Sequence, residues 1–229
     1  MVETSSFWDV IILEANRIIP LLIQATYETF IMTFISLSIA AIIGIPLGVL
    51  LVITRPNHIL EQKGVYLIIN GLINMIRAVP FIILLFAIIP FTRWVAGTTI
   101  GIRGVIVPLV IFTFPFIARI TESALLEVNR GIIEAFLAMG ATPLQIIRKV
   151  LLRESRSTMV LGLTMAIINL IGASAMAGMA GSGGLGDLAI RFGYQQYDWK
   201  VMLATVIVLI IIVQGLQGIG NFIANKLKK

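Results

Sequence analysis

The amino-acid sequence predicts an all-α integral membrane protein with five transmembrane helices. Hydrophobic residues make up 59% of the 229 residues and charged residues only 12%, whereas roughly a quarter of a soluble domain is charged. The apolar residues gather into runs long enough for a helical crossing, which needs roughly 20 residues. Basic residues beside these runs are divided unequally between the two sides of the membrane, which limits the number of crossings. The chain therefore has room for several spans but not for a large soluble domain.

The first twenty residues predict a helix that lies in the membrane interface. Apolar residues recur there at helical spacing, with charged or polar residues between them. The segment has neither the basic start nor the small-residue cleavage pattern of a removable signal peptide. We therefore expect an N-terminal interfacial helix at 1–20, a transmembrane domain at 21–225 and a basic cytoplasmic tail at 226–229.

Five apolar runs follow, separated by short polar or charged stretches. Pro80 interrupts the second run, which reads either as one kinked crossing or as two short crossings. The third run continues as a more polar helix that we expect to emerge into water. The runs extend over about 22–53, 64–90, 100–120, 159–180 and 201–223.

The basic residues decide between one and two crossings in the second run. With five spans and the N-terminus outside, ten lysines and arginines of the loops and tails face inward and five face outward, as the positive-inside rule requires. Splitting the second run would turn one of the inner basic groups outward. The net charge of +6 thus indicates membrane anchoring and not nucleic-acid binding. We expect an outer N-terminus and an inner C-terminus.

A charged segment at 131–156 separates the third and fourth runs and predicts a helix, a turn and a second helix. Gly140 can take the left-handed conformation that ends a helix, Thr142 can cap the next helix, and Pro143 suits its first turn. Both helices are too short and too polar to span a membrane. Two interpretations remain open: a loop resting on the membrane surface, or a docking element whose apolar side chains enter a groove of a partner protein. The apolar faces comprise Ile132, Ile133, Phe136 and Met139 on the first helix and Leu144, Ile147 and Leu151 on the second.

This segment resembles the EAA loop of ABC importer permeases. The family positions are occupied by Glu134, Ala135, Gly140, Val150 and Leu152. Phe136 replaces a small residue of the pattern and Arg153 replaces its closing proline, which leaves the end of the second helix undetermined. The resemblance implies that the segment couples this subunit to an ATPase. The residues expected to do so are Glu134, Ala135, Phe136, Met139, Gly140 and Leu144.

Four further stretches, at 77–85, 90–98, 115–128 and 174–194, are together similar to the permease subunit of methionine-importing ABC systems. The resemblance implies a homodimer in the cell membrane, two copies of a separate ATP-binding subunit and an extracytoplasmic methionine-binding protein. ATP and magnesium would belong to the partner subunit, so this chain would hold no cofactor or metal. The sequence contains no GxxxxGK[ST] phosphate-binding loop, and we do not expect an enzyme. The expected cargo is L-methionine, D-methionine or a close analogue, with another small amino acid or polar solute as the alternative.

Two other classes of function fit the residues less well. An intramembrane enzyme would need a nucleophile with a base, paired aspartates or a metal cluster at span depth, whereas the only histidine, His58, lies in a loop and no aspartate lies in a span. An ion- or proton-coupled carrier would usually have ionisable residues near mid-bilayer, where only Arg77 qualifies clearly. Cysteine is absent, which excludes disulfides and thiolate metal sites.

The second and fourth runs contain candidates for a transport pathway. Arg77 must face protein or water inside a bilayer, and Asn70 and Asn74 can share the polar side of a kink with it. Small residues spaced by four in the fourth run allow close helix approach, either in ordinary packing or as a gate at a dimer axis with methionines as a soft plug. The candidates are Arg77, Ser174, Met176, Gly178 and Met179.

Two remaining patterns carry weaker expectations. Residues 181–186 satisfy GxGxxG by letter, but a transmembrane run precedes them where a dinucleotide site needs a strand, so we expect a flexible outer turn. Arg119 and Glu122, three residues apart, can pair on one helix face, and a solvated or interfacial pair of this kind contributes little stability.

Overall fold

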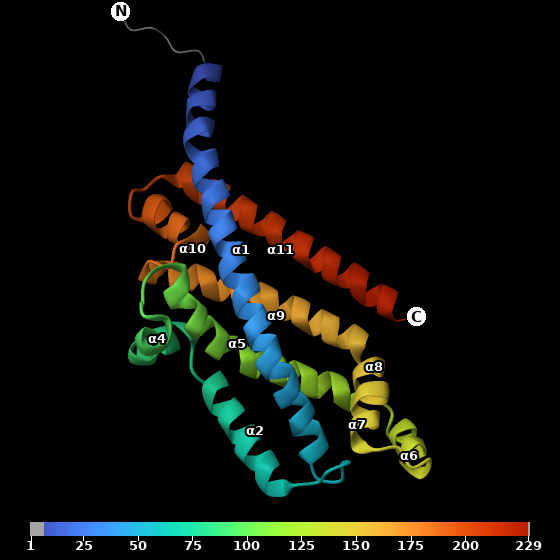
Figure 1. Ribbon diagram of the computed structural model, residues 1–229. Coiled ribbons are helices and arrows are strands. Elements are labelled where there is room, and N and C mark those ends of the chain that lie inside the picture. The colour runs from blue at the N-terminus through green and yellow to red at the C-terminus, as the bar shows by residue number, and fades with distance from the viewer. Residues whose placement is uncertain (1–6, 229) are drawn as a thin grey trace, which may run out of the picture.

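Helices and the turns between them make up the described part of the chain, residues 7–228 of the computed structural model (Figure 1). The all-helical prediction is thereby confirmed. Four of the described helices are long and apolar enough to cross a membrane: α1 (Phe7–Thr54), α5 (Gly101–Leu126), α9 (Arg156–Ala177) and α11 (Trp199–Leu227). The shorter helices are α2 (Lys63–Arg77), α3 (Phe81–Ala87), α4 (Ile89–Ala96), α6 (Arg130–Ala138), α7 (Pro143–Ile146), α8 (Leu152–Glu154) and α10 (Gly184–Leu188), with π-helical turns at Ile147–Leu151 and Ala189–Tyr194 and a 3-10 turn at Gly178–Ala180.

The longest element is α1, which runs across the other helices (Figure 1). At about 1.5 Å per residue, a helix of this size is roughly 70 Å long, more than twice the thickness of a hydrocarbon core of about 30 Å. Two glycines allow it to pack closely on α5. A Cβ atom at Gly44 would lie 2.6 Å from the backbone oxygen of Phe114, and one at Gly48 would lie 2.5 Å from Cβ of Thr121. The α1–α5 pair thus forms the most extensive helix contact of the described fold.

The expected interfacial helix is not a separate element. Residues 1–6 lie outside the described part of the chain, and from Phe7 the helix passes Pro20 without a break into the first span. An internal proline removes one backbone hydrogen bond, but packing on both sides of it holds the helix together. Ile18, Leu21 and Leu22 contact a cluster built with residues of α10 and α11. Whether residues 7–20 lie in the interface stays a prediction.

The second apolar run is broken at the predicted proline. Helices α2 and α3 meet at 100°, and Pro80 stands immediately before α3. The pair is apolar enough to count together as one bent span, which gives the described helices four spans, or five with this pair. Five crossings therefore remain a prediction that the fold permits.

One face of the polar end of the third run is buried by the rest of the chain, while Ser123 and Glu127 are exposed, and its emergence into water stays a prediction. Helix α5 continues to Leu126, and Thr121, Glu122 and Leu125 are buried. The cause is tertiary packing, because the end of α1 and the 131–156 segment cover this end of α5 in one apolar cluster. A second cluster, built around Met32, Leu109 and Leu170, joins α1, α5 and α9 further along.

Candidate functional site

The 131–156 segment has the predicted helix–turn–helix form. Asn129 caps α6 by accepting a hydrogen bond from the Gly131 amide at 2.8 Å. Gly140 ends the helix with φ of +78°, a conformation that favours glycine. At α7 the Thr142 side chain accepts from the Gln145 amide at 3.4 Å, and the Gln145 side chain accepts from the Thr142 amide at 2.9 Å. This reciprocal capping box fixes where the second helix begins.

One face of the segment is built into the fold. Ile133, Ile146, Val150 and Leu151 are buried in a cluster with residues at the ends of α1 and α5, among them Val52. The sequence placed Leu144, Ile147 and Leu151 on one face of a regular α-helix. In the structure Leu151 is buried but Leu144 is exposed, Ile146 and Val150 also take inner positions, and a π-helical turn spans Ile147–Leu151.

The other face presents apolar side chains to solvent. Met139 is 71% exposed and Leu144 is 55% exposed, and both stand beside the turn that Gly140 makes. Glu134 and Ala135 are also exposed, whereas Phe136 is half-buried against the inner cluster. Of the predicted apolar docking contacts, the structure therefore leaves Met139 and Leu144 fully available and Phe136 only in part.

A cavity of about 300 Å³ separates this segment from the loop after α1. His58, Arg130, Glu134 and Leu137 line it. Burial lowers the pKa of His58 below its usual value, and the nearby positive charges of Arg130 and then Arg55 add to this effect. The imidazole is therefore held neutral near pH 7, as expected of a turn residue packed under a helix.

A polar network inside the fold joins α2 to α5. The Arg119 guanidinium donates to Glu122 at 2.5 Å and to the side-chain oxygen of Asn74 at 2.7 Å, and it also donates to Asn70. Glu122 is buried, and Arg55 lies 4.0 Å from its second oxygen. The predicted Arg119–Glu122 pair is thus present, with Glu122 buried and Arg119 partly buried.

Of the expected group of Asn70, Asn74 and Arg77, the two asparagines take part in this network. Both asparagines are bound by Arg119, while Arg77 is exposed and borders a mostly apolar groove of about 390 Å³ with Phe116 and Met165. Among the described residues, no ion pair includes Arg77. An arginine at this depth must meet water or an anion, so Arg77 keeps its standing as a pathway candidate.

The small residues of α9 pack within this chain. Ala173 and Ala177 belong to the core shared with α1 and α5, and the Ser174 hydroxyl donates to the Ile171 carbonyl at 2.8 Å. A Cβ atom at Gly178 would lie 2.3 Å from the Asp187 amide nitrogen. These contacts favour ordinary packing over a sliding gate.

The methionines of this region are placed differently from its small residues. Met176 and Met179 are exposed, away from the α9–α10 contact. They remain the candidates for a plug at an interface with another chain.

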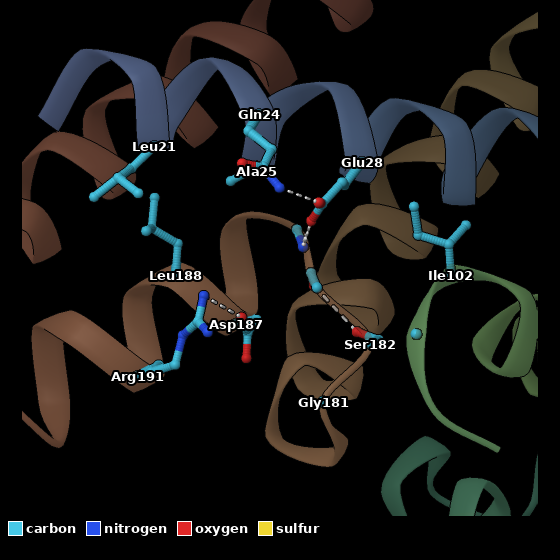
Figure 2. Close-up of a pocket in the computed structure, with 13 residues that line it drawn as sticks. Leu21, Gln24, Ala25, Glu28, Ile102, Gly181, Ser182, Asp187, Leu188 and Arg191 are labelled. Carbon is cyan, nitrogen blue, oxygen red and sulfur yellow. Dashed lines mark hydrogen bonds and ion pairs between the residues drawn. The ribbon is translucent and has the colours of Figure 1, made fainter.

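Two hydrogen bonds anchor the glycine-rich turn to α1, whereas its composition predicted a flexible turn, and its outer position stays a prediction. Figure 2 shows Glu28 reaching the start of α10, where its carboxylate accepts from the Gly184 amide at 2.7 Å. Thr29 accepts from the Leu185 amide at 2.9 Å. A carboxylate already occupies the place where a dinucleotide phosphate would bind, and a helix precedes the turn, so GxGxxG has no cofactor role here.

The cavity in Figure 2 continues from this contact over about 370 Å³. The ion pair between Asp187 and Arg191, at 3.2 Å, forms part of its wall. Glu28, an ionisable residue of the first apolar run, was not among the residues predicted from the sequence.

Charged residues also fasten the start of α1 to the start of α11. Arg17 donates to Glu14 at 2.9 Å and to Asp198 at 2.5 Å, and Lys200 donates to Glu14 at 3.1 Å. Partial desolvation acts to raise the pKa of Asp198, but the hydrogen bonds from Arg17 and the Val201 amide outweigh it and leave this pKa lowered. Asp198 is therefore a helix cap and ion-pair partner.

The chain is similar in sequence to inner membrane components of transport systems. The family model described as "Binding-protein-dependent transport system inner membrane component" matches residues 44–229. The chain is 47% identical over 206 residues to the "Probable D-methionine transport system permease protein MetI" of Vibrio cholerae, covering 90% of this chain and 92% of that protein. It is 49% identical over 158 residues to the D-methionine transport system permease protein MetI of Escherichia coli K12, covering 69% of this chain and 73% of that protein.

Solved structures agree with the sequence relatives. A chain of the MetNI methionine ABC transporter in an inward-facing conformation superposes with a TM-score of 0.90 at 45% identity, covering 91% of this chain and 97% of that chain. A chain of an amino acid ABC transporter crystallised with histidines gives a TM-score of 0.76 at 18% identity, covering 97% of this chain and 99% of that one, which shows a shared fold alone.

Proposed function

This chain belongs to the family of binding-protein-dependent transport system inner membrane components, and from that membership we propose that it is the permease subunit of an ATP-driven importer of methionine. The main support for methionine as the cargo is the 47% identity, over 90% of the chain, to a D-methionine permease relative. The likeness to a MetNI chain, with a TM-score of 0.90, supports the same cargo. L-methionine and D-methionine share an uncharged thioether side chain, so both are proposed substrates.

The proposed assembly follows from the same relatives and from the charge pattern. Two copies of this chain would enclose one pathway, two ATP-binding subunits would dock on the inner side, and an extracytoplasmic binding protein would deliver methionine. Each copy would cross the cell membrane five times, with the bent α2–α3 pair as the second span, an outer N-terminus and an inner C-terminus. ATP and magnesium would be held by the partner subunit.

The 131–156 segment is proposed as the element that transmits movement from the ATP-binding subunits. Its buried face contacts the ends of α1 and α5, and its exposed face carries Met139 and Leu144 on either side of the Gly140 turn. A partner that grips the exposed face would move these span ends together with it, because the buried face is packed at close density. Glu134 and Ala135 lie exposed on the same segment and are proposed as further coupling contacts.

Transport by the assembled complex tests the function. The permease would be reconstituted in liposomes with its cognate ATP-binding subunit and binding protein, and uptake of labelled methionine would be followed alongside ATP hydrolysis. We expect ATP-dependent uptake that excess unlabelled L- or D-methionine suppresses. Uptake of a different amino acid that methionine does not suppress would contradict the proposed cargo while preserving the importer.

The exposed apolar pair offers a sharper test of coupling. Met139→Asp and Leu144→Asp each place an unpaired charge on the proposed docking face, and we expect the ATP-binding subunit to bind roughly 30-fold more weakly or worse, as at an interface hot spot. Leu60→Asp is the matched control, because Leu60 is a similarly exposed leucine in the loop after α1. Equal binding by all three variants would remove the docking role from this segment.

A further inference from the structure

A basic groove lies where the 131–156 segment meets the ends of two spans. Its walls come from α6, the π-helical turn, α8, the start of α9 and the end of α11, and its volume is about 530 Å³. Four cationic side chains line it, namely Lys149, Arg153, Arg156 and Lys228. Glu154 is the one carboxylate in its lining, which leaves an excess of three positive charges.

These charges are not neutralised within the described part of the chain. The ion pairs between residues 7–228 include none of the four cations and do not include Glu154. Like charges gathered around one concave space repel each other and raise the local concentration of anions. The groove is therefore electrostatically suited to an anionic occupant.

The groove also has an apolar wall. Phe136 and Val150 of the 131–156 segment and Leu227 at the end of α11 line it together with the cations. A small inorganic anion has no hydrocarbon that could pack against this apolar surface. A ligand that carries both a negative headgroup and hydrocarbon matches both parts of the lining.

The position of the groove indicates which amphipathic anion is available. Arg156 begins α9 and Leu227 ends α11, and these two span helices run side by side. The groove thus lies at the level where two apolar helices leave the membrane. Basic pockets at the cytoplasmic end of transmembrane helices are typical sites for anionic lipid headgroups.

We propose that this groove binds the phosphate headgroup of an anionic phospholipid, with Arg153 and Arg156 as its principal contacts. The apolar wall would contact the start of the acyl chains. Assignment to the inner leaflet rests on the orientation in the proposed function, whereas the binding itself does not. A lipid held there would join the 131–156 segment to the end of α11, so it would stabilise the segment against displacement from the spans.

Lipid retention by the complete complex tests the site. The transporter, with its ATP-binding subunits, would be placed in nanodiscs containing phosphatidylglycerol and phosphatidylcholine, then released into detergent and weighed intact by native mass spectrometry. The test variant is Arg153→Gln/Arg156→Gln. The control, Lys63→Gln/Arg148→Gln, removes two exposed cations from the same end of the molecule but outside the groove.

We expect wild type and control to retain phosphatidylglycerol selectively and the test variant to bind it about 30-fold more weakly, since two cations near a membrane surface contribute roughly this factor. Equal retention by test variant and wild type, or no preference over phosphatidylcholine in wild type, would overturn the proposal. So would loss of the ATP-binding subunit from the test variant in both lipids, which would make the groove a protein contact, or displacement of the lipid by millimolar inorganic phosphate. Because retention is measured without transport, its failure would leave methionine uptake untouched as a separate question.

Discussion

At the scale of single residues, Arg119 stands out because it satisfies three polar partners inside an apolar fold. Glu122 is buried, and the oxygens of Asn70 and Asn74 turn toward the same guanidinium. A buried ion pair offsets its own desolvation only with good geometry and further hydrogen bonds, and here the two asparagines supply such bonds to Arg119. The ion pair should therefore show its effect as a loss of protein stability when one partner is removed and the other is left buried.

Arg119→Met is expected to destabilise the protein by about 3–5 kcal/mol, because it leaves the Glu122 carboxylate buried without its closest cation. The double variant Arg119→Met/Glu122→Met should be considerably more stable than the single variant, since it removes both charges. Thermal denaturation of the purified complex in detergent measures both. Arg103→Met, at an exposed arginine of the same helix, is the control and should change little. A double variant no more stable than Arg119→Met would show that the pair does not act as a unit.

At this scale, the sequence predicted contacts between residues that are close together in the chain, and it did not predict contacts between distant residues. The cap at Thr142, the turn at Gly140 and the Arg119–Glu122 pair each involve residues within three positions of each other, and all are present. The contact of Glu28 with Gly184 joins residues 156 positions apart, and that of Arg119 with Asn70 joins residues 49 apart. Such contacts follow from how helices pack and leave no local signal.

At the scale of the elements, α9 and α10 approach each other almost backbone to backbone. A Cβ atom at Gly178 would lie 2.3 Å from the Asp187 nitrogen, and one at Gly186 would lie 2.3 Å from Cα of Ala175. Backbone atoms cannot rotate away as a side chain can, so these glycines are required by the contact. A larger residue at 178 would therefore disturb the packing of the subunit itself.

Gly178→Ala should lower the stability of the folded subunit by at least about 1–3 kcal/mol, the usual effect of overpacking. Gly172→Ala is a matched control on α9, because nothing lies within 4 Å of a Cβ atom there. In a helix interior this exchange should stabilise by up to about 1 kcal/mol. The yield of monodisperse protein and its thermal midpoint in detergent distinguish the two. Equal stability of both alanine variants would mean that α10 can shift to relieve the contact.

Helix boundaries show where elements depart from their sequence patterns. Hydrophobic length predicted the fourth and fifth runs to within a few residues, because a bilayer demands continuous apolar helix. The π-helical turn at Ile147–Leu151 was not predictable, since one extra residue in a turn depends on which side chains find room in the inner cluster. The unbroken passage of α1 through Pro20 depends in the same way on packing against α10 and α11.

At the scale of the whole molecule, much apolar surface of the described residues lies outside the chain's own core. α11 buries few of its residues in this chain, and α1 also exposes large side chains such as Ile42. Apolar exposure of this kind is ordinary for a span that faces lipid, so exposure alone cannot identify a subunit interface. The position of a charged side chain is more informative, and it favours the side of the groove that Arg77 and Met165 line.

Cross-linking of single-cysteine variants can locate the dimer interface directly, because the chain has no native cysteine and needs no prior substitutions. Met176 is exposed at the end of α9, while neighbouring Ala177 is buried in the chain's own core, so Met176 is proposed to face the second copy across the pathway.

Met176→Cys should therefore give a covalent dimer with an oxidant or a short bis-maleimide. Ile42→Cys, on an exposed position of α1 that is expected to face lipid, should give far less dimer. A disulfide needs Cα atoms within about 7 Å, so oxidant-driven dimer at position 176 would place the two copies of α9 beside each other at the axis. Equal dimer yields at the two positions would instead indicate random collision in the membrane and would remove Met176 from the proposed pathway.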